Sequence, residues 1–145
     1  MNYTECIEQA RGRIGSHCKA CWECNGRACK NQMPGPGAKG IGDTAIRNYD
    51  KWKEIRVQMD TLVENRPCDT TLELFDRTFQ YPFFAGPVGA VQLHYGDCLN
   101  DISYNDILVS ACAASGIAAF TGDGTDSNVM VAATKAIKNA GGLGI

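Results

Sequence analysis

Two stretches near the start of the chain carry apolar residues at helical spacing. The first predicted helix covers residues 2–14, where Asn2 can act as the N-cap with Glu5 three positions later. The second is predicted from its cap Asp43 to about residue 56, because its apolar side chains recur every three positions. Before it lies a run rich in glycine and proline, residues 33–42, which is incompatible with regular structure.

The pattern changes near residue 70, where apolar and polar residues begin to alternate. Alternation over Thr71–Phe75 and again over Thr78–Tyr81 predicts two short strands. Asp76 and Arg77 lie between them as the expected two-residue turn of a β-hairpin, although the glycine that such turns favour is absent.

From residue 82 onward, short apolar runs alternate with longer segments of helical periodicity. A run that is apolar throughout is typical of a strand covered on both faces, and caps and glycines mark the helix ends. The predicted order is a strand at 82–87, a helix capped by Ser103 and ended by Gly116, a strand at 117–121, a helix from Asp126 or Ser127 to Gly141, and the start of a strand at 143–145. This alternation requires a parallel sheet with helical crossovers, so the predicted fold class is α/β.

The chain therefore divides into a helical, cysteine-rich segment at 1–66 and a segment of repeating strands and helices at 67–145. The second segment holds too few units to close a sheet on itself. Its last residues run directly from a helix into an apolar stretch, whereas domain boundaries usually fall in polar linkers. We expect the chain to be the incomplete N-terminal part of a larger domain and to be inactive alone.

Composition excludes several classes of partner. Hydrophobic residues make up 44% and charged residues 21% of the 145 positions, as in soluble globular proteins. The formal net charge of −2 does not favour a nucleic-acid partner. No apolar stretch is long enough to span a membrane, and the N-terminus lacks the order of a signal peptide, so we expect a cytoplasmic protein without a membrane partner.

Four of the eight cysteines are clustered near the N-terminus. Cys18, Cys21 and Cys24 form a C-x2-C-x2-C run, and four residues separate Cys24 from Cys29. In a chain without a signal peptide, such clustering favours metal or redox chemistry over disulfides. An iron–sulfur cluster is the leading interpretation because bacterial clusters use the same opening run. A tetrahedral zinc site and free thiols stay open as alternatives, and the neighbouring His17 is a further candidate ligand.

Ligands of parallel α/β folds bind at the carboxyl edge of the strands, and two such edges can be recognised here. The first strand ends at residues 86–89, where small residues allow the backbone to lie close to a flat ring and a proline restricts the turn. The second ends at residues 121–124, which offer a hydroxyl and a carboxylate. The candidate cofactor-binding residues are Gly86, Pro87, Val88, Gly89, Thr121 and Gly122.

Taken in order, these features resemble the FMN-dependent α-hydroxy-acid dehydrogenase/oxidase family. The resemblance runs from about Arg47 to Ile145 and rests on Asn48 and Trp52, Ile55-Arg56-Val57, Asp69-Thr70-Thr71, Tyr81 to Pro87, and Ala113 to Gly116. It implies the N-terminal portion of a (β/α)8 TIM barrel, a fold of ~250 residues, preceded by the helical cysteine-rich segment. It also implies an FMN ring against residues 87–89, a bond from Thr121 to the flavin edge, and oxidation of a 2-hydroxy acid to a 2-oxo acid.

The same resemblance places the catalytic base, the substrate-binding arginines and a lysine near the flavin beyond residue 145, so no catalytic residue is assigned. Hydroxy-acid oxidases carry a tyrosine near the N-terminus, and Met33–Gly37 offers none. Two other functions therefore stay open: another FMN-barrel enzyme such as flavin-dependent isopentenyl diphosphate isomerase, and a non-catalytic metal-binding module. The expected partner is a small-molecule hydroxy acid, and a homo-oligomer is compatible with the sequence.

Overall fold

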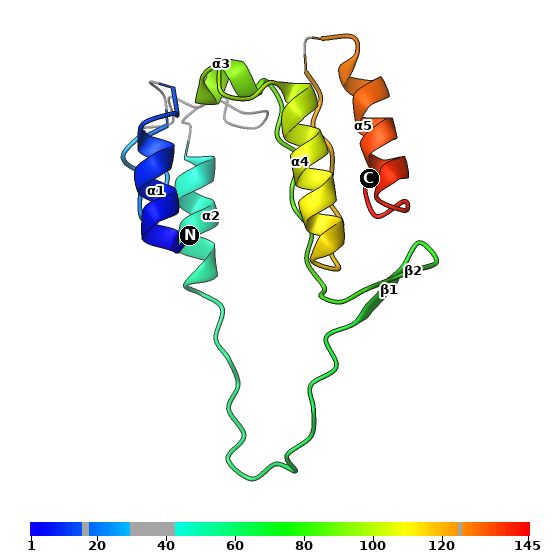
Figure 1. The fold of residues 1–145 in the computed structure, drawn as a ribbon. Coiled ribbons are helices and arrows are strands. Elements are labelled where there is room, and N and C mark those ends of the chain that lie inside the picture. Colours follow the sequence, from blue (N-terminus) through cyan, green and yellow to red (C-terminus); the bar gives the residue numbers. More distant parts are fainter. Residues whose placement is uncertain (16–17, 30–42, 125) are drawn as a thin grey trace. The chain divides into compact units, whose positions relative to one another are not determined.

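The computed structural model describes residues 1–15, 18–29, 43–124 and 126–145 (Figure 1). The chain forms two compact units: unit 1 comprises Met1–Glu64 with Leu93–Cys98, and unit 2 comprises Asn65–Gln92 with Leu99–Ile145. The elements of the described residues are α1 (Tyr3–Arg11), α2 (Thr44–Trp52), β1 (Leu72–Leu74), β2 (Arg77–Phe79), α3 (Val91–Tyr95), α4 (Asp101–Ala114) and α5 (Val129–Asn139). None of these helices has the length and apolar character needed to cross a membrane.

Helices α1 and α2 of unit 1 are both shorter than their apolar patterns predict. The start of α1 is confirmed, because Asn2 and Glu5 bond each other's backbone N–H groups in a capping box, at 2.9 and 3.0 Å. The helix then ends at Gly12, a residue of low helix propensity. Asp43 takes the N-cap position of α2 but makes no side-chain cap bond. Neither helix contains a buried residue, so packing does not extend them to their predicted ends.

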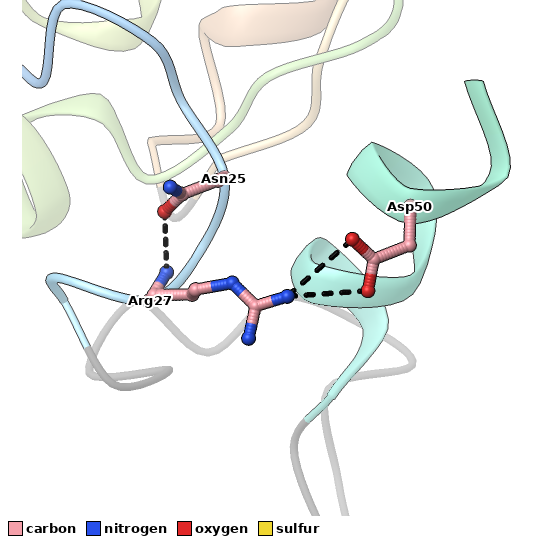
Figure 2. A network of polar contacts seen from close by, with 3 residues as sticks. All are labelled: Asn25, Arg27 and Asp50. Carbon is pink, nitrogen blue, oxygen red and sulfur yellow. Dashed lines mark hydrogen bonds and ion pairs between the residues drawn. The ribbon is translucent and has the colours of Figure 1, made fainter. Parts of the chain in front are cut away.

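The cysteine-bearing segment, residues 18–29, is tied to both of these helices. The Tyr3 hydroxyl on α1 donates to the Trp22 carbonyl at 2.7 Å. Arg27 in the segment forms an ion pair with Asp50 on α2, with 3.3 Å between Nη2 and Oδ2 (Figure 2). Both side chains of the ion pair are about half exposed, at 58% and 48%. Exposed ion pairs contribute little to stability, so we expect this pair to orient the segment relative to α2 more than to stabilise unit 1.

Unit 2 begins with the predicted β-hairpin, but the turn lies one residue earlier than predicted. Strand β1 pairs antiparallel with β2, with Leu74 opposite Arg77. The turn residues are therefore Phe75 and Asp76, and the expected turn at Asp76-Arg77 is wrong because Arg77 pairs within the strand. Both turn residues have positive φ, 52° and 56°, as a type I′ turn requires. Neither is glycine, so the turn holds some backbone strain.

Two parallel bridges join Ala85 to Ala119 and Ala119 to Gly144, which confirms the predicted parallel order of the segments 82–87, 117–121 and 143–145. The segments are not the continuous strands that the sequence predicts, because each is bridged at a single residue. The Phe120 N–H donates to the Ala85 carbonyl at 2.9 Å, and the Ile145 N–H donates to the Ala119 carbonyl at 2.8 Å. The three segments run in one direction, so the helices between them are crossovers. Across the described residues these segments form an α/β fragment without a closed barrel.

The two long helices of unit 2 do not start where the sequence predicts. The N-cap of α4 is Asn100, whose side chain accepts from the Ser103 N–H at 2.8 Å, so the expected cap Ser103 is instead the third residue of the helix. The start of α5 near Asp126 or Ser127 is also too early, since Asp126 accepts from the Asn128 N–H at 2.8 Å in a turn before the helix. Asparagine and aspartate favour such local bonds to the backbone, and several of them compete for each helix start.

The core of unit 2 lies between α4, α5 and the middle parallel segment. Its buried members are Val109 and Cys112 from α4, Ala119 from the segment, and Ala136 from α5. The small residues at 119 and 136 allow the helices to pack closely onto the segment. This core positions the end of the middle segment, where the candidate site begins.

Candidate functional site

The candidate site consists of two turns at the carboxyl ends of the parallel segments. The first turn, residues 86–90, continues from Ala85, and the second turn, residues 121–124, follows shortly after Ala119. Because Ala85 and Ala119 are bridged in parallel, the two turns lie at the same end of the parallel segments. All six predicted cofactor-binding residues belong to these turns, and both turns belong to unit 2.

The two turns contact each other through their backbones, at positions where each carries a glycine. A Cβ atom added to Gly122 would overlap the Val88 carbonyl, and one added to Gly89 would overlap the Asp123 carbonyl. Only glycine permits so close an approach. Gly89 and Gly122 therefore allow the turns to pack directly on one another.

Asn105, on α4, binds the second turn. Its side chain is fully buried, with 0% exposure. The Asn105 Nδ2 donates to the Gly122 carbonyl at 3.3 Å, and the Asn105 Oδ1 accepts from the Gly122 N–H at 3.2 Å. One amide side chain thus satisfies both polar backbone groups of Gly122, as their burial requires.

Asp101 lies one helical turn before Asn105 and contacts the second turn and the residue that follows the first turn. Its Oδ1 accepts from the N–H of Val91, which directly follows the first turn, at 2.8 Å. Its Oδ2 lies so close to Gly124 of the second turn that a Cβ atom there would clash. One face of α4 therefore contacts the second turn and the residue after the first turn.

Gly86 and Pro87 form the exposed part of the first turn. Within the described residues, nothing lies within 4 Å of the place where a Cβ atom on Gly86 would stand. A flat ring could therefore approach the backbone here to van der Waals distance. The backbone at Gly86 is therefore accessible, and a side chain at this position would cover it.

Thr121 stands at the end of the middle segment and is half-buried. Its N–H and its hydroxyl both donate to the Ile145 carbonyl, at 2.7 and 3.1 Å. The hydroxyl oxygen keeps lone pairs that can accept a further hydrogen bond. Thr121 is thus oriented by the third parallel segment and can accept from a ring N–H.

The four clustered cysteines are not gathered into a ligand group. Over the described ranges, no three His, Cys, Asp or Glu side chains lie close enough to hold a metal ion. Cys24 is exposed and the other three are half-buried. The Cys18 sulfur accepts from the Ala20 N–H at 3.5 Å, and the Cys29 thiol donates to the Gly26 carbonyl at 3.7 Å. The other candidate ligand, His17, and the segment Met33–Gly37 lie outside the described residues.

Two titratable side chains on α4 have raised pKa values because they are shielded from water. Burial raises the pKa of the Cys112 thiol, and burial followed by the nearby Cys112 raises the pKa of Tyr104. A raised pKa keeps each group neutral near pH 7. Neither residue belongs to the two turns, so we assign both to the support of the core and not to acid–base chemistry.

Sequence reasoning missed Asp101 and Asn105 as members of the site. A signal for them existed, because positions 101, 105, 109 and 112 are spaced as one stripe of a helix. Val109 and Cys112 make the later part of that stripe apolar and buried. A polar residue on a buried stripe needs a hydrogen-bond partner, and here the partners are the two turns.

Comparison with known proteins identifies a family. Residues 35–140 match the model of a protein family described as FMN-dependent dehydrogenase. The matched range covers most of the chain and includes both turns and α4, whereas the clustered cysteines precede it. No curated protein and no solved structure shows a significant match.

Proposed function

Because the chain belongs to the FMN-dependent dehydrogenase family, we propose that it serves the oxidation of a 2-hydroxy acid to a 2-oxo acid. Family membership makes the protein an oxidoreductase with FMN as its cofactor, and the substrate class is our proposal. FMN bound at this site would supply the hydride acceptor for that oxidation, and a base would have to accept the hydroxyl proton. No residue of this chain is assigned as that base, so its own residues bind and orient the ring.

We also propose that unit 2 is the beginning of a (β/α)8 barrel. The order of segments and crossovers supports this, together with the parallel bridges through Ala119 and the family to which the chain belongs. Cofactors of such barrels bind at the carboxyl ends of the strands. The two turns lie at that edge.

The proposed flavin site is supported by the accessible backbone at Gly86, which lies at the same end of the parallel segments as Thr121. In the proposed arrangement the backbone of Pro87, Val88 and Gly89 would hold the ring, beside the exposed Gly86, and the Thr121 hydroxyl would accept a hydrogen bond from a ring N–H. Gly89 and Gly122 contribute by allowing the turns to meet, since side chains at these positions would force them apart. These residues therefore provide a surface for the ring and one hydrogen bond to it. None of them carries a positive charge for the flavin phosphate.

The test uses the protein at its full natural length. Cofactor released by heat is identified by chromatography, and the enzyme is then assayed with a panel of short 2-hydroxy acids. We expect one FMN per chain and flavin reduction by at least one hydroxy acid. Stoichiometric FAD or NAD would overturn the cofactor site. Conversion of isopentenyl diphosphate without any hydroxy-acid oxidation would overturn the substrate class in favour of the isomerase.

A single substitution tests the position of the ring. Gly86→Ala places a methyl group in the open space, so we expect a dissociation constant for FMN at least tenfold higher with an unchanged melting temperature of the flavin-free protein. Gly12→Ala is the matched control, because its added Cβ meets only the Gln9 carbonyl at an ordinary 3.6 Å. Unchanged FMN affinity in Gly86→Ala would show that the ring lies elsewhere.

We propose a second, separate role for the cysteine-bearing segment: Cys18, Cys21, Cys24 and Cys29 bind one metal centre, an iron–sulfur cluster or zinc. The spacing of the four cysteines supports this. The four thiols must move together to bind, and metal binding commonly supplies the energy for such ordering.

Metal analysis of anaerobically purified protein tests this role. We expect iron with acid-labile sulfide, or one zinc, and a sharp loss of that metal when any one of the four cysteines is changed to Ser. Cys68→Ser and Cys98→Ser are the matched controls, since both cysteines are exposed and lie outside the cluster. Protein without iron and zinc, or equal metal content in all variants, would leave four free thiols.

A further inference from the structure

We propose that Asn105 is the positioning residue of the flavin site, and that it acts together with Asp101 to set the backbone against which the ring lies. This inference rests on the proposed function. Asn105 does not reach the ring surface itself, because its side chain is fully buried. It acts through Gly122, and Gly122 acts through the first turn.

The first step is the bond between Asn105 and the second turn. Gly122 and Gly124 can adopt many backbone conformations, so residues 121–124 do not favour one conformation by themselves. The Asn105 amide removes that freedom by donating to the Gly122 carbonyl and accepting from its N–H, at 3.3 and 3.2 Å. The two bonds together determine where the Gly122 backbone lies and how it is rotated.

The second step carries this constraint to the first turn. Gly122 lies directly against the Val88 carbonyl, and Gly89 lies directly against the Asp123 carbonyl. These backbone contacts leave no room for either turn to move toward the other. A displaced Gly122 therefore displaces Val88, which is next to the exposed Gly86 and Pro87.

The third step is the rigid support behind both turns. Asp101 fixes the exit of the first turn by accepting from the Val91 N–H at 2.8 Å. Asp101 and Asn105 lie four positions apart on α4, so they project from one face of the helix. This face of α4 therefore contacts both the second turn and the residue that follows the first turn.

Asn105→Asp is the sharpest test because the two side chains have the same shape. The carboxylate can still accept from the Gly122 N–H, but it cannot donate to the Gly122 carbonyl and instead repels it. Val109→Ala is the matched control: it destabilises the same helix one turn further on and touches neither turn of the site. Asn105→Asp is expected to alter the flavin, and Val109→Ala only the stability.

Three measurements on the full-length protein decide the matter. In Asn105→Asp we expect at least a tenfold higher dissociation constant for FMN and a shifted absorption maximum of the bound flavin, whereas Val109→Ala lowers the melting temperature and leaves both flavin properties unchanged. Without flavin, we expect faster amide hydrogen exchange in Asn105→Asp at residues 86–91 as well as at 121–124.

Each contrary result has a definite meaning. Wild-type flavin affinity and spectrum in Asn105→Asp would overturn the positioning role. Equal losses of affinity in Asn105→Asp and Val109→Ala would overturn it as well, because the loss would then follow from lower overall stability. Unchanged exchange at residues 86–91 would overturn the transmission between the turns. A wild-type protein without FMN would refute the proposed function alone, because hydrogen exchange still tests the support by Asn105.

Discussion

Units 1 and 2 are ordered by different kinds of interaction. In unit 1, the described residues include a single buried apolar residue, Ala20, and their contacts include hydrogen bonds, two exposed ion pairs and contacts of exposed aromatic rings such as Tyr3 with Trp22. Unit 2 contains the other buried apolar residues of the described chain: Phe79, Val91, Val109, Cys112, Ala118, Ala119, Val129, Ala133 and Ala136. The hydrophobic effect therefore stabilises unit 2 far more than unit 1.

This difference matters for the candidate site. The backbone of the two turns is held by α4, whose position depends on the core of unit 2. A site on such a support keeps its geometry when a surface contact is lost. The cysteine-bearing segment lacks this support, so we expect its geometry to respond to metal binding. Substitutions at matched positions can test both halves of the comparison.

The largest effect is expected from Ala119→Asp. Ala119 is fully buried and bridges both neighbouring segments, so a carboxylate there would be an unpaired charge in the core. We expect a loss of about 3–5 kcal/mol in the free energy of unfolding, measured with denaturant on the full-length protein. Met130→Asp on α5 is the control, because Met130 is 65% exposed and its substitution should change little. A mild effect at Ala119 would mean that the parallel core is not what stabilises unit 2.

Gly122→Ala should have the next largest effect. The added methyl group overlaps the Val88 carbonyl, so the turns must separate and the bonds to Asn105 must lengthen. We expect a loss of about 1–3 kcal/mol, typical of an overpacked site, accompanied by loss of FMN binding. Gly86→Ala should differ by weakening FMN without loss of stability. Equal behaviour of the two variants would contradict the separation between a supporting and a ring-facing glycine.

The two capping boxes offer the same substitution in both units. Asn100→Ala removes the cap of α4, and we expect it to cost about 1 kcal/mol of global stability, a usual value for an N-cap. Asn2→Ala removes the cap of α1, which contains no buried residue. We expect it to reduce helicity in the circular dichroism spectrum without lowering the main unfolding transition. A shift of that transition by Asn2→Ala would show that unit 1 contributes more to global stability than its burial indicates.

The smallest effect concerns the reactivity of thiols. Burial raises the pKa of Cys112 above its ordinary value of 9.0, so this thiol is neutral in the folded state where an unfolded thiol would begin to ionise. We therefore expect stability to be constant below that pH and to fall as the pH rises past it, because the unfolded chain then releases a proton that the folded chain retains. At pH 8, an alkylating reagent should modify Cys112 more slowly than the exposed Cys68 and Cys98. Equal labelling rates would show that the core opens readily.

Several features of the fold could be predicted because they depend on neighbours along the chain. The capping box of Asn2 and Glu5, the existence of the hairpin, and the alternation of strands and helices all follow local patterns. The errors were local as well. The hairpin turn and the start of α4 are each displaced, because polar residues such as Asp76 and Ser103 suit more than one position of a turn or cap.

The sequence by itself determined the α/β class, the order of the parallel segments and the two glycine-rich turns, since apolar periodicity and glycine content need no knowledge of distant contacts. Only the tertiary structure decided that the turns meet at Gly89 and Gly122 and that Asn105 holds them. The reason is physical: Asn105 and Gly122 are 17 positions apart, and their bond exists only after α4 has packed on the parallel segments. A buried hydrogen bond of this kind depends on how the core packs, and local sequence patterns do not predict that packing.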